Sequence, residues 1–145
     1  MKLTCTFISL AILLSSVSAQ LTASYDTGYD NAQRSLSTVA CSDGPNGLLT
    51  RGFTTFGSLP NYPNVAGAPA VTGWNSPGCG TCWTVTYTNA KGKSKSINLL
   101  AIDVAPNSYN MPTSAMNNLT GGQATSLGRV PVTAVSVPPS VCGLV

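Results

Sequence analysis

The chain has 145 residues and a formal net charge of +3, and only 8% of its residues are charged. It contains no histidine, which excludes Ser-His-Asp and Cys-His catalysis, and its four acidic residues are all aspartates. Glycoside hydrolysis needs only carboxylates and is not excluded. The single basic cluster, Lys91 to Lys95, is typical of a solvated hairpin turn, so we expect no nucleic-acid partner.

The first 19 residues have the layout of a secretory signal peptide. Lys2 precedes an apolar run from Phe7 to Leu14, and the small residues Val17-Ser18-Ala19 follow as a cleavage site. The run is shorter than the roughly 20 residues of a spanning helix, so no membrane span is expected. We predict a signal peptide over residues 1–19 and one exported domain over residues 20–145, located outside the cell or in the wall.

Four segments of this domain are predicted to be extended. Residues 34–41 and 67–74 each precede a turn sequence. Residues 83–87 alternate β-branched or aromatic side chains with others, and residues 95–103 are a nearly continuous apolar run. The turn at Lys91-Gly92 joins the last two into a predicted hairpin.

The C-terminal third predicts one helix and one further strand. Residues 111–119 suit a helix that has Asn110 as its N-cap and Gly121 and Gly122 as its stop. Residues 129–137 alternate again, and Pro131 favours a strand start or an edge strand. The sequence therefore indicates a mostly β domain with one or two short helices.

Four cysteines, Cys41, Cys79, Cys82 and Cys142, remain after the signal peptide, and an even number in an oxidising compartment favours disulfides. Zinc would need all four thiols, so we expect no metal and no cofactor. A redox Cys-x-x-Cys pair usually begins a helix, whereas Cys82 runs into a predicted strand. If residues 79–82 are extended, the two Cα atoms lie about 10 Å apart, too far for a disulfide. Each then pairs with Cys41 or Cys142, which leaves two connectivities open. The alternative is a turn at Gly80-Thr81 that brings the two cysteines together.

Five blocks of sequence between Ser24 and Cys142 carry a family resemblance. In order they are SYDTGYDNAQRSL, VACSDGPNGL, VTGWNSPGCGTCW, INLLAIDVA and MNNLTGGQATSLGRV. They resemble the cerato-platanin family of small secreted fungal proteins. The resemblance implies a single-domain double-psi β-barrel, as in the N-terminal domain of expansins and related endoglucanases, with disulfides Cys41–Cys79 and Cys82–Cys142. It also implies non-hydrolytic, expansin-like proteins that bind chitin oligomers, loosen polysaccharide and elicit plant defence.

Asp103 is the strongest candidate for a functional carboxylate. It ends the apolar run NLLAID, and the resemblance places it where the related endoglucanases keep a catalytic acid. Shielding at the end of an apolar strand would raise its pKa. The structural alternative is that Asp103 accepts backbone N–H groups of the following turn, VAPNS. The sequence shows no clear second carboxylate for hydrolysis.

Further polar and aromatic positions in the matched blocks suit a shallow sugar-binding groove, because neutral saccharides need donors, acceptors and a ring to stack on. These positions are Tyr25, Asp26, Ser42, Asp43, Gly44, Asn75 and Ser76. The alternative for Asp43, Asn75 and Ser76 is a role in local turns. Trp74 could also stack on a sugar, whereas Trp83 is expected in the core.

Asn118 begins the only N-glycosylation sequon, but its overlap with the predicted helix argues against occupancy.

The leading functional hypothesis is a secreted protein without enzymatic activity that binds chitin or N-acetylglucosamine oligomers, loosens cell walls and elicits plant defence. One alternative is a weak polysaccharide hydrolase with Asp103 as general acid. Another is a surface-active, self-assembling protein, which the low charge favours. Chitin or related polysaccharide oligomers and a plant receptor are the expected partners of a protein that we expect to be monomeric.

Overall fold

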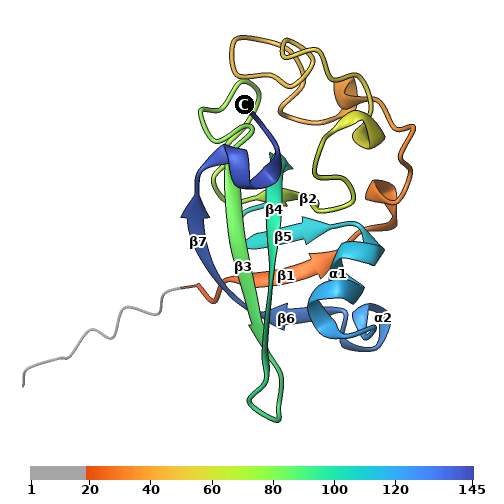
Figure 1. Ribbon diagram of the computed structural model, residues 1–145, viewed down its shortest axis with the longest axis vertical. Coiled ribbons are helices and arrows are strands. Elements are labelled where there is room, and N and C mark those ends of the chain that lie inside the picture. The colour runs from red at the N-terminus through yellow and green to blue at the C-terminus, as the bar shows by residue number, and fades with distance from the viewer. Residues whose placement is uncertain (1–18) are drawn as a thin grey trace, which may run out of the picture.

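The computed structural model describes residues 19–145, so residues 1–18 of the predicted signal peptide lie outside the described part (Figure 1). Seven strands form one sheet in the order β6-β1-β5-β2-β4-β3-β7. The strands are β1 (Thr22–Tyr25), β2 (Val65–Ala68), β3 (Cys82–Thr88), β4 (Ser94–Val104), β5 (Ser108–Met111), β6 (Arg129–Pro131) and β7 (Thr133–Val137). The helices are α1 (Thr113–Thr120) and α2 (Ala124–Leu127), and four short 3-10 turns lie at Thr27–Tyr29, Leu36–Thr38, Phe56–Ser58 and Pro139–Cys142.

The two ends of the strand order are adjacent in the chain. β6 pairs with β1 and β7 pairs with β3, yet only Val132 separates β6 from β7. The sheet must therefore curl until its edges approach, as a barrel does. The predicted fold class is confirmed: the described chain is one mostly β domain with two short helices and two disulfides.

The predicted hairpin is confirmed as β3 and β4, which pair antiparallel from Cys82↔Leu100 to Thr88↔Ser94. The register places Val85 opposite Ile97, and both side chains are buried on the same face of the hairpin. The strands narrow to an exposed tip (Figure 1). There Asn89 Oδ1 accepts the backbone N–H groups of Lys91 and Lys93, both at 3.0 Å. This side chain fixes the turn.

Two segments predicted as extended are mainly turns. In residues 34–41, Ser35 Oγ accepts the N–H of Ser37 at 3.1 Å and begins a 3-10 turn. Hydroxyl side chains compete for backbone N–H groups in this way and divert a segment from strand pairing. In residues 67–74, only the first two residues belong to β2, because Pro69 cannot continue the ladder.

The predicted helix is α1, but the predicted N-cap is wrong. Asn110 lies in β5, and Pro112 directly precedes the helix. The carboxylate of Asp30 takes the capping role from a distant segment: Thr113 donates to it from its N–H at 2.7 Å and its hydroxyl at 2.8 Å. Gly121, at φ 69°, ends the helix as predicted.

The strand predicted over residues 129–137 is divided into two strands at Val132. Pro131 lies on β6, at one end of the strand order, as expected for an edge strand.

The disulfides are Cys41–Cys79 and Cys82–Cys142, the pairing that the resemblance implied. The chain between Cys79 and Cys82 is not extended, because Gly80 turns it at φ 75°, yet the two cysteines still pair with other partners.

Candidate functional site

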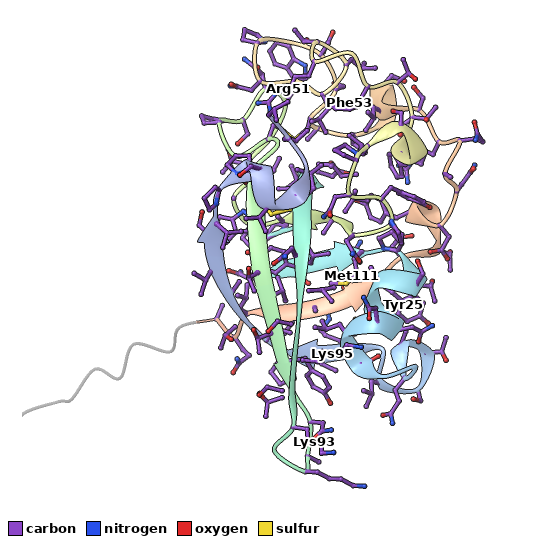
Figure 2. All side chains as sticks on the ribbon, in the orientation of Figure 1. Tyr25, Arg51, Phe53, Lys93, Lys95 and Met111 are labelled. Carbon is purple, nitrogen blue, oxygen red and sulfur yellow. A yellow bond between two sulfur atoms is a disulfide. The ribbon has the colours of Figure 1, made fainter. Side chains whose placement is uncertain are left out.

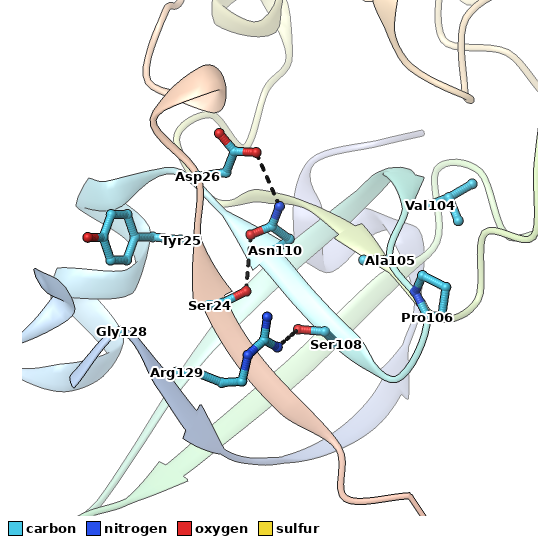
Figure 3. A pocket seen from close by; sticks show the side chains of 10 residues that line it. All are labelled: Ser24, Tyr25, Asp26, Val104, Ala105, Pro106, Ser108, Asn110, Gly128 and Arg129. Atoms are coloured by element: carbon cyan, nitrogen blue, oxygen red, sulfur yellow. Dashed lines mark hydrogen bonds between the residues drawn. The ribbon is translucent and has the colours of Figure 1, made fainter.

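An open groove of about 700 Å³ lies over β1, β5 and the start of β6 (Figure 3). Its lining residues are Ser24, Tyr25, Asp26, Val104, Ala105, Pro106, Ser108, Asn110, Gly128 and Arg129. We call this set the groove. Tyr25 and Asp26 are the two predicted site residues that it includes.

The floor of the groove is a hydrogen-bonded row of short polar side chains. The parallel pairing of β1 and β5 places Ser24 opposite Asn110. Ser24 Oγ donates to Asn110 Oδ1 at 3.1 Å, and Asn110 Nδ2 donates to Asp26 Oδ2 at 3.5 Å (Figure 3). The strand register therefore fixes how these donors and acceptors are presented.

Arg129 provides the positive charge of the groove. Its Nη1 donates to Ser108 Oγ at 2.9 Å and to Thr22 Oγ1 at 2.7 Å. Asp26 lies at the opposite end of the polar row in Figure 3. The groove thus combines one cation, one carboxylate and several neutral polar groups.

Tyr25 and Asp26 differ in how they line the groove. The side chain of Asp26 is exposed, and its Oδ1 accepts the N–H of Gly28 at 2.7 Å. The ring of Tyr25 is half-buried and packs against the core. In Figure 3 it points away from the polar row, toward the helices, so it contributes to the rim of the groove rather than to its floor.

The other predicted groove residues, Asp103 apart, form a separate cluster in two loops. We define the loop cluster as Ser42, Asp43, Gly44, Asn46, Trp74, Asn75 and Ser76, none of which lines the groove. The Cys41–Cys79 disulfide joins these two loops.

Trp74 is the exposed aromatic residue of the loop cluster. Its side chain is 63% exposed, and its Nε1 donates to Asp43 Oδ1 at 2.6 Å. This hydrogen bond is the main reason that the pKa of Asp43 lies below its usual value. The indole ring is therefore held in a defined position, and its exposed surface could stack on a sugar.

The remaining members of the loop cluster hold the two loops together. Asn75 Oδ1 accepts the N–H of Asn46 at 2.9 Å. Gly44 has φ 82°, and a Cβ there would lie 2.9 Å from Asn75 Oδ1. Ser76 is buried, and its Oγ accepts the N–H groups of Thr72 and Gly78, both at 3.2 Å. The bond from Gly78 to Ser76 is the local turn contact that the alternative predicted, whereas Asn75 binds the other loop rather than its own turn.

Asp103 lies beside the groove at the end of β4. Its Oδ1 accepts the N–H groups of Ala40 and Val104, both at 2.9 Å, and its Oδ2 accepts the hydroxyl of Tyr29 at 2.9 Å. The bond from Val104 is the turn contact that the structural alternative predicted. Asp103 does not line the groove, but the next two residues, Val104 and Ala105, do. Burial, assisted by the adjacent carboxylate, raises the pKa of Tyr29.

Sequence reasoning missed Ser24, Ser108, Asn110 and Arg129 as lining residues. The available signal was their position in the matched blocks, because Ser24 begins the first block and Arg129 lies near the end of the last. Ser108 and Asn110 belong to β5, a strand that was not predicted.

The structure also places Trp83 and the glycosylation candidate Asn118. Trp83 packs against the core, and its Nε1 donates to Thr81 Oγ1 at 2.9 Å. Asn118 is exposed on α1, but Thr120 of its sequon is buried and donates to the carbonyl of Met116 at 2.7 Å.

Within residues 19–145, no group of three or more His, Cys, Asp or Glu side chains could hold a metal ion. No helix in the same range is long and apolar enough to cross a membrane.

Comparison with known proteins agrees with this architecture. A cerato-platanin family model matches residues 21–144. The heat-stable 19 kDa antigen of Coccidioides immitis is 49% identical over 121 residues, which cover 83% of this chain and 80% of that protein. Cerato-platanin of Ceratocystis fimbriata f. sp. platani is 41% identical over 120 residues, which cover 82% of this chain and 84% of that protein.

Comparison with solved structures also finds cerato-platanins. The crystal structure of cerato-platanin 2 from M. perniciosa matches with a TM-score of 0.80 and 47% identity, covering 86% of this chain and 98% of that one. The solution structure of Cerato-Platanin, described as a fungal elicitor, matches with a TM-score of 0.71 and 40% identity, covering 83% and 95%. The chain belongs to the cerato-platanin family.

Proposed function

We propose that this protein is a secreted, non-catalytic carbohydrate-binding protein that takes chitin or N-acetylglucosamine oligomers in the groove. The observation that carries the proposal is the hydrogen-bonded row of Ser24, Asn110 and Asp26 beside Arg129. An oligomer of neutral, hydroxylated and amide-bearing sugars needs such a mixture of donors and acceptors. The open shape suits a chain that continues beyond the bound sugars.

The proposal assigns binding without bond cleavage. Each of the four aspartates accepts a hydrogen bond within the protein: Asp26 from Gly28, Asp30 from Thr113, Asp43 from Trp74 and Asp103 from Tyr29. Asp26 is the one that lines the groove, whereas hydrolysis needs two carboxylates across one bond. Competition for hydrogen bonds between polymer chains would then produce expansin-like loosening.

Asp103 supports the groove in this proposal through its bond to Val104, whose side chain lines one end. An Asp103→Asn variant should weaken polymer loosening, while release of reducing ends from chitin and cellulose stays at background in both proteins. Steady release by the wild type that disappears in Asp103→Asn would favour a hydrolase instead.

The decisive experiment is a calorimetric titration with an N-acetylglucosamine oligomer. Arg129→Gln should weaken binding about tenfold or more, since a hydrogen bond to a charged group contributes about 1.5–3 kcal/mol. Arg51→Gln is the matched control: Arg51 is exposed and does not line the groove, and its replacement should leave the affinity unchanged. Equal affinities of both variants and the wild type would refute the assignment of the groove, once circular dichroism shows that all are folded.

Elicitor activity is proposed by likeness to the solved fungal elicitor. Purified protein applied to plant leaf tissue should trigger an oxidative burst, which would require recognition by a plant receptor. A folded protein that produces no response would exclude this role.

A further inference from the structure

A second, smaller cavity of about 250 Å³ lies between the β3–β4 hairpin and the end of α1, away from the groove. Its lining residues are Tyr87, Asn89, Lys93, Ser94, Lys95, Leu119, Thr120 and Gly121. We propose that this cavity binds a saccharide that carries carboxylate groups, such as a uronic-acid oligomer.

The hairpin presents two lysines and a tyrosine on one of its faces. Antiparallel pairing places Tyr87 directly opposite Lys95. Lys93 is two residues from Lys95, and alternation in an extended chain places such residues on the same face about 7 Å apart. Both lysines are exposed, and Tyr87 is half-buried. Figure 2 shows Lys93 close to the tip of the hairpin. A ring beside two cations suits a sugar chain that bears several carboxylates.

The hairpin is rigid enough to preorganise these groups. On its other face, Thr86 and Ser96 form a hydrogen bond of 2.7 Å across the strands, and Thr88 and Ser94 form one of 2.6 Å. Asn89 fixes the tip through its bonds to the backbone of Lys91 and Lys93. These bonds fix the backbone from which Lys93, Lys95 and Tyr87 project, so the backbone loses little conformational entropy when a ligand binds.

The lysines of this face have no role in the fold that would compete with a ligand. The protein has four carboxylate side chains, and their hydrogen-bond donors described above are other residues. The hairpin carries three of the six cationic side chains of residues 19–145, namely Lys91, Lys93 and Lys95, and the other three are arginines elsewhere in the domain. This local excess of positive charge would attract an anionic ligand.

The end of α1 favours a hydroxylated ligand over a compact anion. The N–H groups of Gly121 and Gly122 both donate to the carbonyl of Asn117, so neither donates to the carbonyls of Asn118, Leu119 or Thr120 at the end of the helix. A helix C-terminus carries partial negative charge, which repels any anionic group placed against it but accepts hydrogen bonds from hydroxyl groups. A uronic-acid sugar offers carboxylates to Lys93 and Lys95 and hydroxyls to these carbonyls.

The composition of the hairpin tip argues against insertion into a lipid bilayer. Residues 89–95 contain one apolar side chain, that of Ala90, among lysine, serine, asparagine and glycine. Peripheral helices and loops that enter the interface need larger apolar side chains. Anionic vesicles are therefore a control ligand rather than the expected one.

The test is a titration of the full secreted domain with a galacturonic acid trimer in about 0.15 M salt. The Lys93→Gln/Lys95→Gln double variant should bind about tenfold more weakly than the wild type. Lys91→Gln is the matched control, because Lys91 is exposed on the same hairpin but does not line the cavity, and it should lose less than twofold. Tyr87→Phe should retain binding, whereas Tyr87→Leu should weaken it about fivefold.

Several results would overturn the proposal. Equal losses in Lys91→Gln and in the double variant would indicate diffuse charge attraction and no defined site. Binding of inorganic phosphate or of anionic vesicles as tight as that of the uronate would also refute it. The double variant should still bind an N-acetylglucosamine oligomer like the wild type, so this test and that of the groove fail independently. In NMR spectra, the uronate should shift the amides of Thr120 and Gly121 and leave those of Ser24 and Asn110 unchanged.

Discussion

The groove and the loop cluster both present polar side chains to solvent, but they are held in place by different means. The groove lies on paired strands, so the register of β1, β5 and β6 positions Ser24, Asn110 and Arg129. The loop cluster has no ladder, and its geometry depends on side-chain hydrogen bonds, on Gly44 at positive φ and on the Cys41–Cys79 disulfide. Substitutions in the groove should therefore change binding, whereas substitutions around the loop cluster should change stability.

The largest effect is expected from the disulfide that joins the two loops. The Cys41→Ser/Cys79→Ser double variant removes a disulfide whose cysteines are 38 residues apart in the sequence. The entropy of closing a loop of that length in the unfolded chain corresponds to about 4 kcal/mol of stability. The free energy of unfolding, measured by denaturant titration, should fall by about that amount.

The control for this prediction is the Cys82→Ser/Cys142→Ser variant, which removes a disulfide whose cysteines are 60 residues apart and should lower the free energy of unfolding by a similar amount. Only the first variant should also release Trp74, detected by its fluorescence under native conditions. A loss of well under 1 kcal/mol in Cys41→Ser/Cys79→Ser would mean that side-chain contacts alone hold the loop cluster.

The next largest effect should come from the contact that ties the barrel to the N-terminal loop. Tyr29 is buried and donates to the carboxylate of Asp103, so Tyr29→Phe should cost about 1.5–3 kcal/mol. Tyr109→Phe is the matched control, because Tyr109 is also buried but its hydroxyl makes no hydrogen bond to another described residue. Equal costs in the two variants would show that the bond to Asp103 adds nothing.

The same tyrosines predict instability in alkali. Burial raises the pKa of Tyr109 to about 12 and, together with Asp103, also raises that of Tyr29. A raised folded pKa stabilises the protein below the usual tyrosine value of about 10, and this contribution is lost as pH rises toward the folded value. The free energy of unfolding should fall above about pH 10, and less steeply in Tyr29→Phe.

A smaller effect is expected at Gly44. Its φ of 82° disfavours a side chain, and a Cβ would lie 2.9 Å from Asn75 Oδ1 and 3.1 Å from Trp74 Cζ2. Gly44→Ala should destabilise the protein by about 1–2 kcal/mol. Gly73→Ala is the control, because a Cβ at Gly73 meets no atom within 4 Å. A neutral Gly44→Ala would show that the loop cluster adapts easily.

The smallest effect concerns the ionisation of Asp43. The hydrogen bond from Trp74 lowers the pKa of this exposed carboxyl, so its contribution to stability is present above its usual pKa and is lost as pH falls through the lowered value. Trp74→Phe removes the donor and should raise the pKa of Asp43 toward its usual value. NMR titration of the side-chain carboxyl carbon measures this, and an unchanged pKa would contradict the assigned cause.

The sequence by itself determined the hairpin, because β3 and β4 are long enough for their patterns of side chains to be recognised and Lys91-Gly92 marks the turn. It also determined α1 through its C-terminal glycine, and the family through the spacing of the cysteine-containing blocks. These features depend on residues that are neighbours in the chain.

Only the tertiary structure revealed the floor of the groove and the division of the predicted site. β1 and β5 have four residues each, which is too short for a recognisable period, and they become strands because they pair with each other across more than 80 residues. The same long-range pairing makes Asp30 the cap of α1 and separates Tyr25 and Asp26 from the loop cluster. No local propensity encodes these contacts, because each depends on how distant segments pair when the sheet curls.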